Sequence, residues 1–489
     1  MKSLVLITID CLRSDHVGFL GYKRPVTPFL DRLSRESLIF RNAIAAGAPT
    51  YYSVPSILAS RSPLALGRDL LGLAPGETTL ASVLQEAGFA TAAFSAANPY
   101  ISKRFGFQQG FDQFHDFLSD TAPPAPTELS ATTGFRTRAN QVLARACHSV
   151  KPLGELYDDL YFEYCQKRGT NDAADLDALR MFPSADVITQ HAISWLRDQR
   201  REPFFLWLHF MDPHAPYFPK ANALAAMGDA NINASEAAYL NAFWNREGVA
   251  PGRLEGVRDK VVRLYDAGIR WADEQIGVLT ESLVELNVWD KCALAVTADH
   301  GEEFLDHGGR FHAPLKLTRE LVQVPLLVRV PGQSRSTVAE SFGLIDLAPT
   351  LLDVLGVPAP AEFRGQSWWG GIRKNRIRSR PVVTECVYGC TNPFRPSNRM
   401  GPRVLAVQSG QHKLVLNFSQ GTETLFDLDS DPTERNPLPL PHPAAKDLFA
   451  AAKHHLVEST KARDFDRREA SLLRDLRLEW AHPAASFSN

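Results

Sequence analysis

The sequence has little cysteine, no excess of charge of either sign and no long apolar run. Only six of the 489 residues are cysteines, and they are scattered along the chain. This excludes the dense disulfide framework of a small secreted domain and favours reduced thiols. The 53 basic side chains nearly balance the 55 acidic ones. No basic face for nucleic acid or for an anionic membrane is therefore expected.

The first apolar run is also short, and it leads directly into Asp10. A run of about seven residues is too short for a signal peptide or a membrane span. Together with the reduced thiols, this predicts a cytoplasmic protein that binds neither membranes nor nucleic acid. An anionic substrate would have to be held by local groups, because the net charge is close to zero.

Short apolar runs alternate with longer segments of helical periodicity. The runs cover residues 4–9, 89–96, 204–210, 293–298 and 324–330, and the helical patterns cover 27–37, 78–88, 184–199 and 252–288. Continuous apolar runs of this length are typical of parallel strands that are covered on both faces. The helical patterns supply the covering layers. The sequence therefore predicts an α/β fold with a doubly wound, mostly parallel sheet.

Two departures from this rhythm suggest the domain organisation. Residues 119–182 begin with a loop-like stretch and are expected to form an insertion or a cap over the site. Residues 1–375 would form the main α/β domain. Residues 376–489 would form a smaller α+β subdomain, with a small antiparallel sheet and a helical tail from about residue 444. One interpretation of the tail is a contact in a homo-oligomer.

Two of the apolar runs end in residues that bind metals. Asp10 follows the run 4–9, and Asp299 and His300 follow the run 293–298. The carboxyl ends of parallel strands meet at one edge of a sheet, which is where open α/β folds place their sites. The alternative is that these side chains only cap the next helix. The repeated pattern favours one divalent metal bound by Asp10, Asp299 and His300.

Motifs along nearly the whole chain resemble those of sulfatases of the alkaline phosphatase superfamily. In family order, they are IDCLRSDHVGFLGY at 9–22, TPFLDRL at 27–33, SVPS at 53–56, FMDPHAPY at 210–217, TADHGEE at 297–303, HAPLKLTRELVQVPLLVRVPG at 312–332, DLAPTLLDVLG at 346–356 and LFDLDSDPTE at 425–434. The resemblance implies an alkaline phosphatase-like fold and a divalent metal at Asp10, Asp299 and His300, usually calcium and sometimes manganese or magnesium. An imidazole ligand shifts the preference away from calcium, so the identity of the metal stays open.

The nucleophile of this family lies in a motif of Cys or Ser, any residue, Pro, any residue and Arg, whose first residue is oxidised to formylglycine. The matching stretch begins at Ser53, and Ile57 stands where the family has arginine. The resemblance thus implies Ser53 as the nucleophile, while Ile57 argues against its oxidation. Thr50 is the rival nucleophile and otherwise a substrate-binding residue. The alternative is that both hydroxyls cap a helix that begins near Pro55.

The resemblance further implies catalytic roles for His214, His312 and Lys316, which match positions that contact the sulfate or the leaving group. Either histidine is a candidate general acid, because an imidazole titrates near neutral pH. His209 and His307 are expected to orient the residues that contact the metal or the substrate, without contacting either themselves. Where many sulfatases have a Gly-Lys-Trp-His stretch, this chain has residues 96–107. Asn98 and Lys103 are the candidate substrate contacts there.

The leading functional prediction is a metal-dependent sulfuric ester hydrolase that acts on a small anionic ester. The alternative is a hydrolase or phosphotransferase of phosphodiesters, phosphomonoesters or phosphonates, with Ser53 unmodified. A sulfate ester on serine has no neighbouring hydroxyl to expel the sulfate, whereas metal-assisted attack can cleave a phosphoserine. A non-catalytic binding protein is the third interpretation, and the retained metal ligands argue against it.

Overall fold

A large mixed sheet forms the centre of the protein. The computed structural model describes residues 2–65, 71–118, 175–198, 202–313, 316–377, 379–387 and 403–458. Eight strands lie in the order β10-β2-β9-β6-β1-β5-β3-β4. Their bounds are β1 Ser3–Ile9, β2 Leu38–Ile44, β3 Ala90–Ser95, β4 Gln113–His115, β5 Phe204–Phe210, β6 Cys292–Ala298, β9 Gln323–Arg329 and β10 Ser336–Gly343. Only β9 runs antiparallel to its neighbours, β2 and β6. The predicted fold class is therefore confirmed.

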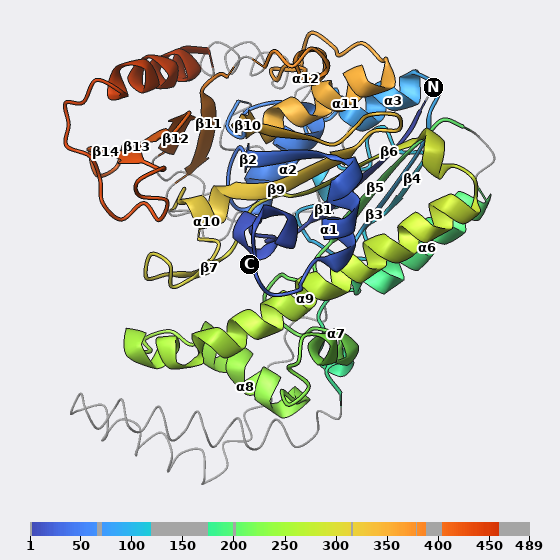
Figure 1. The fold of residues 1–489 in the computed structure, drawn as a ribbon, viewed down its shortest axis with the longest axis horizontal. Coiled ribbons are helices and arrows are strands. Elements are labelled where there is room, and N and C mark those ends of the chain that lie inside the picture. Colours follow the sequence, from blue (N-terminus) through green and yellow to red (C-terminus); the bar gives the residue numbers. More distant parts are fainter. Residues whose placement is uncertain are drawn as a thin grey trace, which may run out of the picture.

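Helices cover both faces of this sheet (Figure 1). One layer contains α1 Pro28–Leu33, α6 Ala185–Asp198 and the long α9 Pro251–Glu285, with α7 Ala221–Ala226 and α8 Ala234–Asn245 packed on α9. The other layer contains α2 Thr50–Ala59, α3 Leu80–Glu86 and α11 Leu347–Leu355. The short α10 Arg319–Val322, α12 Trp369–Arg373 and the hairpin of β7 Glu303–Phe304 and β8 Arg310–Phe311 complete this part. Within the described residues, no helix has the length and apolar character that crossing a bilayer requires.

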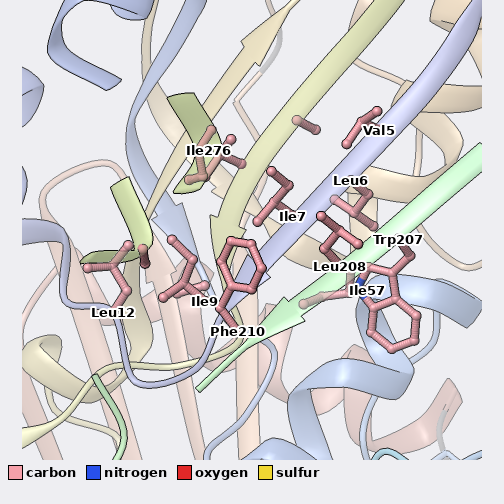
Figure 2. Packing of buried hydrophobic residues seen from close by; sticks show 14 of the residues in the cluster. Val5, Leu6, Ile7, Ile9, Leu12, Ile57, Trp207, Leu208, Phe210 and Ile276 are labelled. Carbon is pink, nitrogen blue, oxygen red and sulfur yellow. The ribbon is translucent and has the colours of Figure 1, made fainter. Parts of the chain in front are cut away.

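The central strands are buried on both faces, as their uninterrupted apolar sequences predict. Figure 2 shows alternate side chains of β1 and β5 pointing to opposite helix layers. Trp207 of β5 packs near Ile57 of α2, whereas Ile7 and Ile9 of β1 lie on the side of Ile276 of α9 (Figure 2). All of these side chains are almost completely buried. Each contributes roughly 1.5–3 kcal/mol to folding through the hydrophobic effect.

All five predicted runs form strands, but the sequence patterns did not reveal β2, β4 and β10. β10, with the sequence STVAESFG, lies at the edge of the sheet, and most of its first five residues are exposed or half-buried. An edge strand has one open side and needs no continuous apolar run. β2 contains the polar pair Arg41 and Asn42, beside an irregularity in its pairing with both neighbours. The pattern at 252–288, in contrast, forms a single helix, α9, with a proline in its first turn.

Helix α9 anchors several segments that lead to the carboxyl edge of the sheet. The Tyr265 hydroxyl donates a hydrogen bond of 2.7 Å to the carbonyl oxygen of Cys11. Asp266 accepts a hydrogen bond of 2.7 Å at Oδ1 from the ring of His16. Asp273 accepts hydrogen bonds of 2.8 Å from the first amides of α1. Burial raises the pKa of Asp273 to about 7.

The C-terminal region forms a second, antiparallel sheet, which agrees with the predicted α+β subdomain. Its strands are β11 Val382–Val387, β12 Arg403–Ser409, β13 His412–Asn417 and β14 Thr422–Asp427, in sequence order. A helix over residues 445–458 packs on this sheet through Leu448 and Ala452. Residues 119–174 of the predicted insertion and residues 459–489 of the predicted tail lie outside the described residues.

Glu385 of β11 connects this sheet to the main domain. Its side chain is fully buried and accepts a hydrogen bond of 3.0 Å from the Leu64 amide. The other carboxylate oxygen accepts a hydrogen bond of 2.8 Å from Arg403 and lies 3.0 Å from His455. Burial would raise the pKa of Glu385, but Arg403 and His455 outweigh this effect and lower it to about 2.

We predict that Glu385→Gln removes a pH-dependent part of the stability. A glutamate with a lowered pKa stabilises the fold above its ordinary value of 4.5, and this stabilisation is lost as the pH falls towards about 2. The shift corresponds to about 3 kcal/mol. Urea unfolding between pH 3 and 6 should show a steep decline for the wild type and a flatter one for the variant. Glu423→Gln, an exposed glutamate on β14, is the control.

Candidate active site

A cluster of buried acids and imidazoles lies at the carboxyl ends of β1, β5 and β6. Asp10 directly follows β1, and Asp299 and His300 directly follow β6. All three side chains are fully buried, and one ligand atom from each lies within 4.8 Å of the others. His300 Nε2 is 3.6 Å from Asp10 Oδ1 and 3.5 Å from Asp299 Oδ2. The structure therefore brings the three predicted metal ligands together.

These residues fit a divalent cation. Asp299 Oδ2 is buried and, within the described part of the chain, has no hydrogen-bond partner. A buried carboxylate oxygen without a partner is costly, and a metal ion would satisfy it. His300 Nδ1 lies 2.8 Å from the Gly301 carbonyl oxygen, which selects the tautomer that leaves Nε2 free to bind a metal. The oxygen and nitrogen donors suit several divalent ions.

Neighbouring imidazoles keep the Asp10 carboxylate charged. Burial would raise the pKa of Asp10, but the charge of His214, the hydrogen bond of His209 and the charge of His300 lower it well below its ordinary range. The His209 ring lies 3.3 Å from Asp10 Oδ2 through Nε2 and 2.8 Å from the Thr8 hydroxyl through Nδ1. Asn98 donates a hydrogen bond of 2.8 Å to the same carboxylate oxygen. These contacts hold Asp10 in place.

The structure brings the Thr50 hydroxyl, and not the Ser53 hydroxyl, to these ligands. Thr50 Oγ1 is 3.4 Å from Asp10 Oδ2 and 3.2 Å from His300 Nε2. Ser53 lies one helical turn further along, and its hydroxyl donates a hydrogen bond of 3.5 Å to the Thr50 carbonyl oxygen. The expected helix start near Pro55 is wrong, because α2 begins at Thr50 and contains Pro55 in its interior. This earlier start directs Thr50 into the cluster, so the assignment of the nucleophile to Ser53 loses its geometric basis.

His214 and His312 stand beside the metal ligands. The His312 ring lies 4.6 Å from that of His300 and 5.1 Å from that of His214, between centroids. Glu302, which is fully buried, accepts a hydrogen bond of 3.1 Å from the Tyr217 hydroxyl and lies 3.1 Å from His312 Nδ1. Both imidazoles therefore lie in the same cluster as His300, whose Nε2 is 3.2 Å from Thr50 Oγ1.

The two lysines among the predicted site residues lie elsewhere. Lys316 Nζ forms an ion pair with Glu303 at 2.8 Å and donates a hydrogen bond of 3.0 Å to the His307 carbonyl oxygen. His307 pairs with Glu320 at 2.8 Å. Lys103 is exposed, and its backbone amide donates to Asp116. No contact described in the structure connects either lysine with the cluster around Asp10, so the roles predicted for them receive no support here.

Two groups of this site, Cys11 and Glu302, were not among the predicted site residues. Cys11 has a φ of 61°, which is unusual for a residue other than glycine and is typical of functional sites. Its Sγ lies 3.2 Å from Asp10 Oδ1 and 3.4 Å from His312 Nδ1. A signal was available, because a cysteine directly after a predicted metal ligand is itself a candidate ligand. Glu302 gave a weaker signal, as one of two adjacent acids in TADHGEE.

Comparisons with known proteins agree with this architecture. Residues 2–357 match the sulfatase family, and residues 312–462 match the C-terminal region of N-sulphoglucosamine sulphohydrolase. The chain is 23% identical to a multifunctional alkaline phosphatase superfamily protein, PehA, of Trinickia caryophylli over 88% of this chain and 90% of the relative. It is 24% identical to an arylsulfatase of Clostridium perfringens over 88% of this chain and 89% of the relative.

A solved structure shares the fold over almost the whole length. A protein in complex with its substrate D-glucosamine-2-N,6-O-disulfate superposes with a TM-score of 0.68, with 16% identity, over 94% of this chain and 98% of that protein. The match to the sulfatase family covers well over half of the chain, from before Asp10 to beyond α11. The chain belongs to the sulfatase family.

Proposed function

We propose that this chain is a metal-dependent sulfuric ester hydrolase in which Thr50 carries the attacking oxygen. The observation that supports this most directly is the position of Thr50 Oγ1, within 3.4 Å of Asp10 and 3.2 Å of His300. Thr50 is also the first residue of α2, and the N-terminus of a helix stabilises negative charge. A hydroxyl in this position can become an anion at low cost.

The proposed reaction has two displacements at sulfur. A divalent cation held by Asp10, Asp299 and His300 would polarise a nonbridging ester oxygen and lower the pKa of the attacking hydroxyl. Thr50 Oγ1 loses its proton to solvent and forms a bond to sulfur while the bond from sulfur to the leaving alcohol breaks, and His214 or His312 gives that alcohol its proton. A water molecule then attacks sulfur, the bond to Thr50 breaks, and sulfate leaves.

The site also suggests which cations suit it. His300 contributes a nitrogen donor, and an imidazole disfavours calcium, which prefers shells made of oxygen. We propose manganese ahead of calcium and magnesium for this position, because both of these ions prefer oxygen ligands. The substrate would be a small anionic ester whose charge is met by the bound cation and the imidazoles, because Lys316 pairs with Glu303 and Lys103 is exposed.

Phosphate or phosphonate ester hydrolysis is the second candidate, and Thr50 itself favours it. Oxidation of a threonine side chain yields a ketone instead of the aldehyde of formylglycine, so the family's usual covalent route is closed at this position. A sulfate ester on threonine has no neighbouring hydroxyl to expel sulfate, whereas phosphothreonine is open to metal-assisted attack at phosphorus. A panel of aryl sulfates, phosphates and phosphonates separates the two candidates.

The cytoplasmic location stays a prediction. Its support from the structure is that Cys11 and Cys292 are buried free thiols. Free, buried thiols are compatible with a reducing compartment.

We predict that Thr50→Ala abolishes turnover, while Ser53→Ala preserves most of it. Loss of a nucleophile typically costs on the order of 10³-fold or more in kcat. Among the described residues, the Ser53 hydroxyl donates to the helix backbone, so its removal should change kcat by less than about threefold. Steady-state kinetics on the ester panel provide the measurement. Equal losses in both variants, with both proteins folded, would contradict the assignment of Thr50.

We predict that the general acid can be identified through the leaving group. Replacing His214 or His312 by Asn should lower kcat most for esters of weakly acidic alcohols, because these need a proton from the enzyme. Nitrophenolate can leave without a proton from the enzyme, so kcat for nitrophenyl esters should fall much less. His191→Asn, which changes an exposed histidine on α6, is the control. If both histidine variants lose activity equally on every ester, neither histidine acts as the acid.

We predict that Asp299→Ala removes metal binding at the carboxyl end of β6. The wild type should gain thermal stability when manganese is added, because a ligand that binds only the folded state raises the melting temperature. The variant should show little or no gain. Asp290→Ala makes the same change in an exposed aspartate just before β6 and should behave like the wild type. An undiminished gain in Asp299→Ala would place the metal elsewhere.

A further inference from the structure

We propose that Lys413 and Glu434 of the C-terminal subdomain are positioning residues, which hold His312 in place beside His300 and His214. Both act through the backbone of the segment that carries His312, and neither is proposed to touch the substrate. The importance of His312 for turnover rests on the proposed function, whereas the contacts that hold its segment do not. The C-terminal sheet would thereby be a part of the active site.

Lys413 on β13 and Glu434, after β14, form a buried ion pair. Lys413 Nζ lies 2.7 Å from Glu434 Oε1, and each side chain is only 2% exposed. The ammonium group also donates a hydrogen bond of 2.5 Å to the Leu317 carbonyl oxygen. Apolar residues of similar volume often stabilise a fold as well as a buried ion pair does. They could not bind the Leu317 carbonyl, so this contact is the part of the pair that stability alone does not explain.

Leu317 ends the segment that carries His312. His312 directly follows β8, and Leu317 lies two residues before α10. The side chain of Leu317 is buried in one hydrophobic cluster with Val404 and Ala406 of β12. Helix α10 lies on the side of the main sheet that faces the C-terminal sheet (Figure 1). Leu317 is therefore attached to that sheet through both its side chain and its carbonyl group.

The hairpin of β7 and β8, which precedes His312, is held from two sides. Arg435 donates a hydrogen bond of 2.7 Å to the Asp306 carbonyl oxygen in the turn of this hairpin. Arg13, in the loop after β1, forms an ion pair of 2.7 Å with the Asp306 side chain. His312 thus lies between two carbonyl groups, those of Asp306 and Leu317, that both accept hydrogen bonds from the C-terminal subdomain.

The turn that carries Glu434 has a conformation fixed by its own hydrogen bonds. Asp431 accepts a hydrogen bond of 2.6 Å from the Asn436 amide and one of 3.1 Å from the Thr433 hydroxyl. The Glu434 amide donates a hydrogen bond of 3.2 Å to the Asp431 carbonyl oxygen. Glu434 has a φ of 54°, which a residue other than glycine keeps only where its surroundings hold it. These contacts direct the Glu434 carboxylate towards Lys413.

The experiment compares the full-length wild type with Lys413→Met and with the double variant Lys413→Met/Glu434→Met, each with manganese added. Lys413→Met alone leaves a buried carboxylate without its partner and should lower the melting temperature strongly. The double variant removes both charges and should recover most of this loss. Neither variant can bind the Leu317 carbonyl, so both should release the segment of His312. Lys446→Met, an exposed lysine of the same subdomain, is the control.

Steady-state kinetics on the ester panel provide one measurement. In the double variant, kcat should fall roughly 10- to 100-fold for esters of weakly acidic alcohols, because a displacement of about 1 Å from a remote mutation can cost about 100-fold. KM should change by less than about threefold, since binding of the ground state is preserved. The dependence on the leaving group should reproduce that of His312→Asn. A different dependence overturns the proposal, and so does full activity in a double variant that has recovered its stability.

Hydrogen exchange provides a measurement that needs no substrate. In the double variant, the amides of the hairpin of β7 and β8 and of His312 should exchange faster, while those of β1 and β6 should not change. Unchanged exchange in the hairpin overturns the proposal. Should Lys413→Met fail to fold, as judged by circular dichroism, the double variant carries the test. Faster exchange at His312, in a protein whose wild type cleaves no ester of the panel, would reject the proposed function and still support the attachment of this segment to the C-terminal sheet.

Discussion

The burial of carboxylates at the ends of adjacent strands is the constraint on which the rest of this structure depends. Asp10 and Asp299 follow β1 and β6, which pair in parallel and therefore end at the same edge of the sheet. Removing these charges from water is unfavourable unless cations or donors meet them. The nearby imidazoles, Asn98 and the start of α2 all serve this need. The groups around the site thus stabilise carboxylate charges that the fold removes from water.

The sequence was sufficient for the parts of the fold that have a strong local signal. The runs that became β1, β5 and β6 are apolar without interruption because both of their faces are covered. Asp10, Asp299 and His300 could be predicted because each directly follows such a run. β10 could not, because its sequence STVAESFG mixes polar residues with apolar ones and contains no uninterrupted apolar run. The local pattern reports how completely a strand is buried, and not whether it belongs to the sheet.

The remainder of the site depends on where a helix begins and on which charges pair, and neither is local information. The proline at position 55 suggested a helix start, but α2 begins at Thr50. Because of this earlier start, the Thr50 hydroxyl, and not that of Ser53, lies next to His300. Lys316 pairs with Glu303 of β7, a partner that a linear motif does not specify. Motif spacing pointed to this part of the chain, while three-dimensional packing brings the Thr50 hydroxyl, and not the Ser53 hydroxyl, next to His300.

Helix α9 holds three segments near the site in place. Within about two and a half turns, it holds the Cys11 carbonyl through Tyr265, the turn after β1 through Asp266 and the start of α1 through Asp273. All three contacts share one helical register. A single-residue insertion before Tyr265 would turn these side chains by about 100° and remove the three contacts at once. Length changes should therefore be poorly tolerated in the first half of this longest helix.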